Sequence, residues 1–257
     1  MIRVEGVEKK YGSFQAVHPL NLHVKTGEVF GFLGPNGAGK TTTIRMLAGV
    51  LAPTAGKIFI GGVDAASEPV ATRKMVGYIP DRPYMYEKLT AREFLAFIGR
   101  IYGMDAGETA QRAEVLLKDH DLIERSDELI EAFSHGMKQR LVLSAALLHS
   151  PSLLIVDEPM VGLDPHGSRQ IKDRFRELAD AGRTVFLSTH SLDVAEEVCD
   201  RVAILYKGRL VALDTVDQLI ARSDLTNDGD LMENRGGIAE GLEAVFMQIT
   251  EEERGSR

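Results

Sequence analysis

The sequence predicts an α/β fold with a mainly parallel sheet, a small N-terminal antiparallel sheet and an inserted block of helices. The parallel sheet is indicated by short runs that are apolar nearly throughout, at residues 29–33, 153–156, 184–188 and 202–206. Such runs are typical of parallel strands covered on both faces. Helical periodicity separates them, since residues 167–181 place Ile171, Phe175 and Leu178 at spacings of four and three. Strands that alternate with helices indicate the α/β class.

The N-terminal region has a different pattern, in which apolar and polar residues alternate. Residues 2–7, 14–17 and 20–24 alternate in this way and are separated by turns. Residues 58–60, ahead of Gly61-Gly62, add another short run. Alternation with a period of two is typical of strands that bury one face. We therefore expect a small antiparallel β subdomain.

Residues 88–149 have an almost wholly helical pattern. Thr90-Ala-Arg-Glu93 is a capping box, which predicts a helix that starts at this point. The apolar residues expected on its buried side are Phe94, Leu95, Phe97, Ile98 and Ile101. A second helix is expected at about residues 107–120. Because the block lies between strand-like runs, we interpret it as an inserted helical subdomain.

The chain divides into one domain over residues 1–220, which contains this insertion, and a C-terminal loop and helical tail over residues 221–257. Residues 215–218 can cap a short helix, and residues 223–237, which are polar and rich in glycine, are expected to form a loop. Residues 238–249 are amphipathic and the end is charged.

Composition excludes several classes of protein. The chain has 257 residues, of which 30 are basic and 38 acidic, so its formal charge is −8. A negative charge argues against sequence-independent binding to nucleic acid. The single cysteine, Cys199, excludes an internal disulfide framework. The longest apolar region, residues 141–156, is interrupted by serines, His149 and Pro151, so no membrane-spanning helix is expected there. We expect a soluble chain in which any membrane role is exerted through a partner.

Residues 34–41, Gly-Pro-Asn-Gly-Ala-Gly-Lys-Thr, match the phosphate-binding pattern G-x-x-x-x-G-K-[ST]. An apolar run precedes the pattern and a helical stretch follows it. Glycines let consecutive backbone N–H groups turn toward a phosphate, and a helix N-terminus adds partial positive charge. Lys40 is expected to reach the β- and γ-phosphates of ATP, and the Thr41 hydroxyl to ligate Mg²⁺. The residues expected at the phosphates are Gly34, Pro35, Asn36, Gly37, Ala38, Gly39, Lys40, Thr41 and Thr42.

The run at 153–156 ends in two carboxylates, Asp157 and Glu158. In a P-loop protein, an acid at such a strand end can hold the Mg²⁺ shell, and a second acid can orient and polarise a water. On its own, an Asp-Glu pair after a strand is commonly a helix cap or a solvated loop. Together with the P-loop it predicts a P-loop NTPase core.

Seven motifs in this order resemble the nucleotide-binding subunit of ATP-binding cassette (ABC) transporters, over about residues 1–215. They are Tyr11 in Lys-Tyr-Gly, the P-loop at 34–41, Gly-Tyr-Ile-Pro at 77–80, Phe-Ser-His-Gly-Met-Lys-Gln-Arg at 133–140, the acidic pair at 157–158, Gly-Leu-Asp-Pro at 162–165 and Ser-Thr-His at 188–190. The resemblance implies an ABC ATPase domain over residues 1–220.

The resemblance also implies a role for single residues. Tyr11 would stack on adenine, Ser134 and Gly136 would belong to the signature loop that closes on ATP bound by the opposite subunit, and His190 would contact the γ-phosphate. Asp164 would lie in the loop that communicates across the dimer. Taken alone, these residues have plainer interpretations: a surface turn residue for Tyr11, a helix N-cap for Ser134, a strand-end histidine for His190 and a turn acid for Asp164.

Two positions depart from the pattern of the family. Asp81 stands where Gln is common. Its side chain is shorter and charged, and it offers an oxygen to Mg²⁺ or to the attacking water. The alternative is a structural role. The signature reads Ser-His-Gly-Met where Ser-Gly-Gly-Gln is usual. His135 restricts the backbone more than Gly would, and Met137 cannot make the polar ribose contact expected of Gln.

We interpret the chain as the ATP-hydrolysing subunit of an exporter-like ABC transporter, at the cytoplasmic face of the membrane. Its partners would be a second copy or a homologous subunit and a separate transmembrane permease, with no nucleic acid. A soluble ABC ATPase acting on ribosomes or DNA is the alternative, and a P-loop kinase of small metabolites is a third. Soluble ABC ATPases usually carry tandem cassettes or coiled-coil insertions. A P-loop kinase would lack the Ser134 signature.

Residues 82–89 are expected to form an exposed connection, because Pro83 disfavours a helical Arg82. Tyr84, Met85 and Tyr86 are residue types favoured at protein interfaces. This predicts a docking surface for the permease, and the alternative is that these side chains pack inside the helical subdomain.

Overall fold

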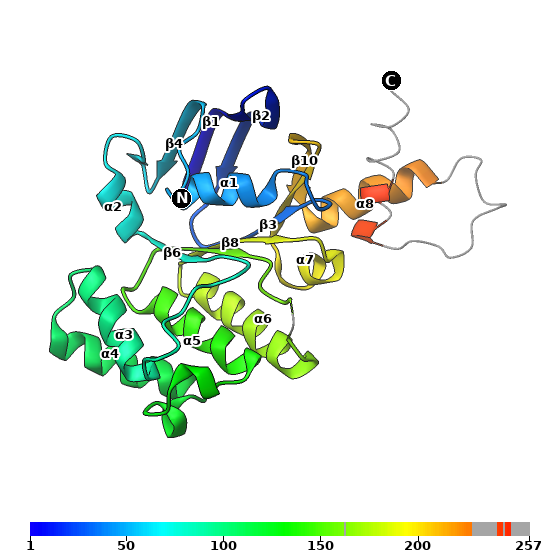
Figure 1. Ribbon diagram of the computed structural model, residues 1–257. Coiled ribbons are helices and arrows are strands. Elements are labelled where there is room, and N and C mark those ends of the chain that lie inside the picture. Colours follow the sequence, from blue (N-terminus) through cyan, green and yellow to red (C-terminus); the bar gives the residue numbers. More distant parts are fainter. Residues whose placement is uncertain (162, 228–240, 244, 248–257) are drawn as a thin grey trace.

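The computed structural model describes residues 1–161, 163–227, 241–243 and 245–247. Two sheets form the upper half in Figure 1, and a group of helices lies below them. A four-stranded sheet has the order β2-β1-β4-β5 and a six-stranded sheet the order β10-β9-β3-β8-β7-β6. This arrangement confirms the predicted fold class of a mainly parallel sheet with an antiparallel β subdomain and inserted helices.

The six-stranded sheet contains every apolar run that the sequence analysis assigned to it. Its strands are β3 (Val29–Leu33), β6 (Val76–Ile79), β7 (Leu153–Asp157), β8 (Thr184–Thr189), β9 (Arg201–Tyr206) and β10 (Arg209–Thr215). Neighbouring strands are parallel except for the β9–β10 pair. The antiparallel sheet consists of β1 (Ile2–Tyr11), β2 (Phe14–Val24), β4 (Ala55–Ile60) and β5 (Val63–Asp64).

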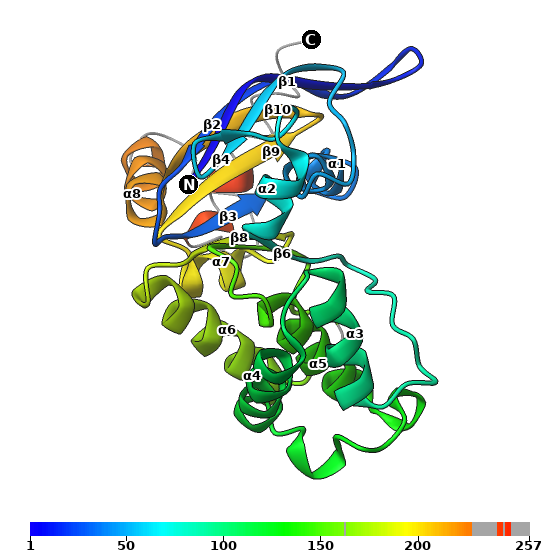
Figure 2. The same cartoon turned by 90° about the vertical axis from the view of Figure 1, so that its left-hand side faces the viewer.

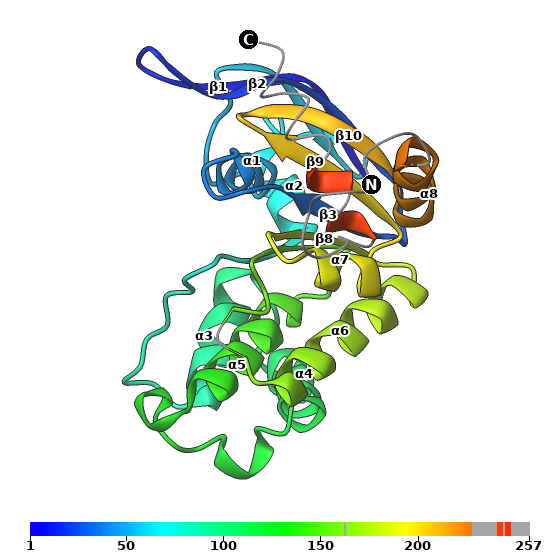
Figure 3. The same cartoon turned by 90° about the vertical axis from the view of Figure 1, so that its right-hand side faces the viewer.

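Alternating side chains of the parallel strands serve two separate cores. In β3, Phe30 and Phe32 pack with the antiparallel sheet and with helix α1 (Lys40–Leu47), while Val29 and Leu33 pack with the helices on the other face. Figure 3 shows α1 between the two sheets. Because both faces are covered, every side chain of β3, β7 and β8 is buried, which explains their continuous apolar sequences.

Helices α3 (Ala91–Ile101), α4 (Ala106–Asp119) and α5 (His135–Leu147) follow β6 and precede β7, together with the short helices η1 (Ile123–Arg125) and η2 (Ile130–Ala132). They form the lower part of the view in Figure 2. The remaining helices are α2 (Pro69–Lys74), α6 (Pro165–Asp180), α7 (Leu192–Val198) and α8 (Val216–Asn227). The capping box of α3 is confirmed, since Glu93 N–H lies 3.2 Å from Thr90 Oγ1 and Thr90 N–H lies 2.8 Å from Glu93 Oε2.

Several boundaries and faces differ from the sequence analysis. Helix α6 starts at Pro165, earlier than expected, because the Asp164 carboxylate caps Gly167 N–H at 2.7 Å and proline suits the first helical position. The loop expected from residue 223 is wrong at its start, since α8 continues to Asn227. The buried side of α3 was also overextended: Phe97 is 37% exposed and Ile101 63% exposed. Most of the expected loop and tail at 221–257 lies outside the described residues.

The order of the strands collects the functional segments at one edge. The P-loop follows β3, Asp81 follows β6, Glu158 follows β7 and His190 follows β8. The carboxyl ends of neighbouring parallel strands lie at the same edge of a sheet, where α/β proteins bind their ligands. The topology alone therefore brings these four segments together.

Candidate functional site

The P-loop, residues 34–39, connects β3 to the N-terminus of α1 and lies against the backbone of other strands. A Cβ atom at Gly34 would collide with the carbonyl oxygen of Leu205, and one at Gly39 would lie 2.8 Å from that of Ala16. Gly39 also has a φ of 104°, which side-chain-bearing residues rarely adopt. It is the N-cap of α1 and has no side chain with which to cap the first turn. The loop thus presents a helix N-terminus that suits an anion.

Lys40 is the first residue of α1 and is only 6% exposed. Its ammonium donates to the carbonyl oxygens of Gly34 at 2.6 Å and of Pro35 at 3.4 Å. It also lies 3.6 Å from Oε1 of Glu158. The Lys40 ammonium at this position can contact the oxygens of a phosphate that the P-loop binds.

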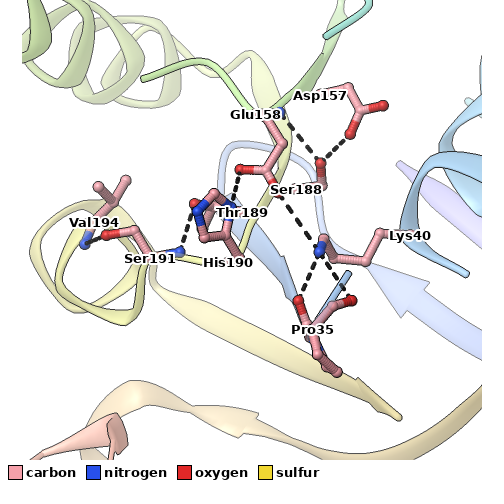
Figure 4. A network of polar contacts seen from close by, with 10 residues as sticks. Pro35, Lys40, Asp157, Glu158, Ser188, Thr189, His190, Ser191 and Val194 are labelled. Atoms are coloured by element: carbon pink, nitrogen blue, oxygen red, sulfur yellow. Dashed lines mark hydrogen bonds and ion pairs between the residues drawn. The ribbon is translucent and has the colours of Figure 1, made fainter. Parts of the chain in front are cut away.

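Glu158 has an unusual backbone for a residue with a side chain. Its φ is 52°, in the left-handed region, and its N–H donates to the Ser188 carbonyl at 3.1 Å. Non-glycine residues in this region cost free energy and are retained where the surrounding structure determines them, often at active sites. The conformation turns the carboxylate away from the end of β7 and toward Lys40 and His190 (Figure 4).

His190 holds the second oxygen of the Glu158 carboxylate. The two groups are 2.9 Å apart, from Nδ1 to Oε2, and the histidine side chain is 55% exposed. A short turn fixes the histidine, because Thr189 Oγ1 accepts from Ser191 N–H at 3.0 Å and the Ser191 hydroxyl caps α7 at Val194. The plain interpretation of His190 as a strand-end residue is therefore incomplete, since its ring reaches the acid.

Asp157 is the last residue of β7 and is 2% exposed. Its Oδ1 accepts a hydrogen bond from the Ser188 hydroxyl (Figure 4). Its Oδ2 is buried and has no hydrogen-bond partner among the described residues. Such an orphaned carboxylate oxygen is costly unless a further group binds it.

These segments surround an open pocket of about 490 Å³. Its lining includes predicted residues from the P-loop, the β1–β2 hairpin and the strand ends: Tyr11, Pro35, Asn36, Gly37, Gly39, Lys40, Thr41, Thr42, Asp81, Glu158 and His190. The sequence analysis missed Phe14, Ala16 and Val161, which line the same pocket. Phe14 is 65% exposed and faces Tyr11 across the hairpin. Phe14 could have been predicted from the sequence, because it is a second aromatic residue just after the Tyr-Gly turn.

The signature residues lie elsewhere. Ser134, Gly136 and Asp164 are absent from the lining of this pocket. Ser134 caps α5, which starts at His135, with Met137 N–H 3.3 Å from its hydroxyl. Met137 is buried, and its sulfur lies 3.6 Å from the Arg125 guanidinium. Ser134 and Gly136 therefore do not line the pocket formed by the P-loop of the same chain.

Asp81 lies at the mouth of the pocket, half-exposed, with Arg82 Nε at 4.0 Å from its carboxylate. Only Pro80 separates it from β6, and it joins the pocket to the connection at residues 82–89. Among the described residues, no group of three or more His, Cys, Asp or Glu side chains is placed to hold a metal ion by itself. The residues that fit Mg²⁺ are the orphaned Oδ2 of Asp157 and the Thr41 hydroxyl, which are oxygen donors of the kind this ion prefers and which leave further positions to phosphate oxygens.

The connection after Asp81 borders a second hollow of about 610 Å³, which we call the aromatic groove and which is lined by Pro83, Tyr84, Met85, Tyr86, Glu87, Lys88, Leu89 and Phe97. Tyr84 is 82% exposed and Tyr86 48%, as the sequence analysis expected. Met85 differs, because it is half-buried and packs against the core. Tyr86 contacts the Phe97 ring edge-on at 5.2 Å, so the exposed face of α3 continues the groove.

Two ion pairs fasten the aromatic groove to the helices that follow. Glu87 lies 2.5 Å from Lys138, one turn into α5, and Lys88 lies 2.5 Å from Glu131 in η2. The backbone adds bonds from Ile130 N–H to the Leu89 carbonyl at 2.9 Å and from Glu131 N–H to the Glu87 carbonyl at 3.1 Å. The groove is therefore connected to the P-loop pocket through Asp81 and to α5 through Lys138.

Comparison with known proteins gives a consistent result. Residues 17–161 match the protein family described as "ABC transporter". The linearmycin resistance ATP-binding protein LnrL of Bacillus subtilis is 40% identical over 86% of this chain and 71% of its own length. The daunorubicin resistance ATP-binding protein DrrA3 of Streptomyces coeruleorubidus is 39% identical, over 86% and 70%. A Nod factor export ATP-binding protein of Paraburkholderia xenovorans is 40% identical, over 86% and 72%.

Solved structures agree with these relatives. An ATP-binding subunit of an ABC transporter superposes with a TM-score of 0.85 at 33% identity, over 97% of this chain and 99% of that one. A dimeric ATP-binding cassette in a post-hydrolysis state, bound to ADP and phosphate, has a TM-score of 0.76 at 25% identity, over 84% and 98%. No helix in the part of the chain that the structure describes is long and apolar enough to cross a membrane.

Proposed function

The chain belongs to the ABC transporter family as an ATP-hydrolysing subunit, and from this premise we propose how its residues bind and cleave ATP. The observation that carries the proposal is the convergence of Lys40 and His190 on the two oxygens of Glu158, at the mouth of a P-loop. A carboxylate in that position can accept a proton from a water that attacks the γ-phosphate, because it lies beside Lys40, whose ammonium would face the same phosphate.

We propose a role for each part of the pocket, which its geometry supports. Tyr11, with Phe14 beside it, offers a stacking surface for adenine at one end of the pocket. The glycine-rich loop, the α1 N-terminus and Lys40 face the phosphates. Glu158 orients the water, and His190 holds Glu158 on the side opposite to Lys40. Phosphoryl transfer of this type depends chiefly on positioning and charge stabilisation, which this arrangement supplies.

Thr41 and Asp157 would hold Mg²⁺, with Asp81 as a third oxygen at the mouth of the pocket. When bound, the ion neutralises charge on the β- and γ-phosphates. The support for this assignment is the buried, unpaired Oδ2 of Asp157. Asp81 is half-exposed, so its contribution would be made from the solvent side.

A complete site requires a second subunit, either another copy or a homologue. Ser134, Gly136 and Asp164 lie outside the pocket of their own chain, and a relative with a TM-score of 0.76 is a dimer bound to ADP and phosphate. We propose that two subunits close head to tail around two ATP molecules, so that the α5 N-terminus of each meets the γ-phosphate held by the other.

The permease would dock in the aromatic groove. Exposed aromatic side chains are favoured at protein interfaces, and Tyr84 and Tyr86 lie between the Asp81 loop and α3. The chain would thereby be held at the cytoplasmic face of the membrane. The relatives named above serve resistance to linearmycin and daunorubicin and export of Nod factor, so we propose that the transporter containing this chain works in export.

The test of the proposed site is ATP hydrolysis by the purified chain with Mg²⁺, compared with the variant Lys40→Ala. The variant is expected to lose turnover, because it removes a buried ammonium that lies against the Gly34 carbonyl and Glu158. Lys172→Ala is the control, since it removes a partly buried ammonium from α6, outside the lining of the pocket. Wild-type turnover in Lys40→Ala would remove the P-loop assignment.

A further inference from the structure

One hydroxyl group contacts both acidic residues of the site. Ser188 is the fifth residue of β8 and is fully buried. Its Oγ donates to Oδ1 of Asp157 and lies 3.3 Å from the backbone N–H of Glu158 (Figure 4). The register explains the contact, because Ser188 is the parallel-strand neighbour of Asp157.

The direction of each hydrogen bond follows from the donors available. An ionised carboxylate only accepts, so the single hydroxyl proton of Ser188 is directed to Asp157 Oδ1. The oxygen of the same hydroxyl then accepts from Glu158 N–H, which also bonds to the Ser188 carbonyl at 3.1 Å. Ser188 thus fixes the side chain of the first acid and the left-handed backbone of the second.

The two oxygens of Asp157 consequently have different environments. Oδ1 has a protein donor and Oδ2 is buried without a partner among the described residues. Because rotation of the carboxylate would break the bond to Ser188, Oδ2 is held in one direction. We propose that Ser188 is a positioning residue, which aims Asp157 Oδ2 at Mg²⁺ and holds Glu158 in its left-handed conformation toward the attacking water. This inference rests on the proposed function, in which Asp157 supports Mg²⁺.

A purely structural role would make a different prediction. If Ser188 only satisfied a buried carboxylate, its removal would lower the thermal stability and leave the response to Mg²⁺ unchanged. Removing a group that orients a metal-binding oxygen typically lowers the metal affinity by about 10- to 100-fold. The dependence on Mg²⁺ therefore separates the two roles.

The experiment measures thermal stability with saturating non-hydrolysable ATP analogue, first in EDTA and then in a Mg²⁺ titration. The concentration of Mg²⁺ that gives half of the stabilisation is expected to rise about tenfold or more in Ser188→Ala. Ser188→Thr keeps the hydroxyl on a residue that suits a strand, and it is expected to restore the wild-type value. Should Ser188→Ala fail to fold, Ser188→Cys replaces it, since a thiol is a weak donor of similar shape.

Thr184→Val is the matched control. Thr184 is the first residue of the same strand, is fully buried and also forms hydrogen bonds through its hydroxyl, to the Lys25 carbonyl at 3.3 Å and from Gly27 N–H at 3.1 Å. Its replacement is expected to lower the melting temperature without changing the Mg²⁺ midpoint. An equal shift of the midpoint in this variant would overturn the assignment to Ser188.

Asp157→Asn, measured in parallel, distinguishes failure of the inference from failure of the proposed function. A shifted midpoint in Asp157→Asn with a wild-type midpoint in Ser188→Ala would overturn the role of Ser188 alone. A wild-type midpoint in Asp157→Asn would overturn the metal role of Asp157, and with it the inference about Ser188. Shifts in both variants and recovery in Ser188→Thr support the proposal.

Discussion

The His190 imidazole and the Glu158 carboxylate lie 2.9 Å apart, from Nδ1 to Oε2, although 31 residues separate them in the chain. The other carboxylate oxygen faces Lys40 at 3.6 Å. Glu158 is therefore held between a histidine from the end of β8 and a lysine from the start of α1. This arrangement explains how a residue with a left-handed backbone can have a defined side-chain direction.

Glu158→Gln is expected to bind ATP and to lose hydrolysis. An amide keeps the shape of the side chain but is a poor proton acceptor, so water activation fails while the P-loop is unchanged. Two subunits that cannot hydrolyse ATP should remain closed, which would be visible as earlier elution in gel filtration with ATP and Mg²⁺. Glu197→Gln is the control, because Glu197 is an exposed acid that pairs with Lys172 of α6. Normal turnover in Glu158→Gln would exclude its role as the base.

Asp81 is expected to respond in a graded way. Asp81→Asn keeps an oxygen and loses the charge, whereas Asp81→Ala loses both, so turnover should fall further in the alanine variant. ATP binding should stay within a few fold in both, because the P-loop supplies most of the phosphate contacts. Equal and near-normal rates would identify Asp81 as a loop acid whose contact is with Arg82.

Buried histidine predicts a loss of stability in acid. Burial, and then the nearby Arg174 charge, lowers the pKa of His120 to about 4, from an ordinary value near 6.5. Between these two pKa values His120 binds a proton in the unfolded chain but not in the folded chain. The free energy of unfolding therefore falls as the pH drops from about 6.5, and the loss levels off below about 4. A shift of this size corresponds to roughly 3 kcal/mol at its limit, with about 1.4 kcal/mol for each pH unit.

His120→Asn tests this assignment. His120 Nδ1 lies 2.7 Å from the Ser144 hydroxyl, which itself donates to the Arg140 carbonyl at 2.9 Å, so the histidine is the donor. An asparagine amide can also donate to Ser144 but does not titrate. Denaturant unfolding at pH 7 and at pH 5 is expected to show a smaller loss of stability in the variant than in the wild type. An equal loss in both would place the acid sensitivity in other groups.

Much of the fold and of the nucleotide pocket could be predicted from the sequence, because the responsible signals are local. Apolar runs such as residues 29–33 predicted the strands. Glu158 and His190 each follow a strand directly, and Lys40 ends the glycine-rich pattern that follows β3. Phe97 and Ile101 were misjudged, because helical periodicity marks an apolar side but does not say whether the same chain covers it. The role of Ser188 was also not apparent, since its bond to Asp157 depends on the pairing of strands far apart in sequence.

The aromatic groove gives the last prediction. Tyr84 and Tyr86 are 82% and 48% exposed, and their rings contact each other edge-on at 5.6 Å, so replacing both removes surface rather than core. Tyr84→Ala with Tyr86→Ala is therefore expected to leave the subunit folded and able to bind ATP. Co-purification with the permease should weaken, and transport should become uncoupled from hydrolysis, because the groove is joined to the nucleotide pocket through Asp81 and to α5 through the Glu87–Lys138 ion pair.

Val70→Ala with Val115→Ala is the control for this prediction, because these side chains on α2 and α4 are 65% and 57% exposed and lie outside the groove lining. That pair of changes should leave the co-purified amount of permease unchanged. Thermal unfolding of the isolated subunit tests whether Tyr84 and Tyr86 stabilise its fold. A melting temperature that falls by several degrees in the tyrosine variant would mean that Tyr84 and Tyr86 stabilise the helical subdomain through the contact with Phe97. The permease would then have to dock on another surface.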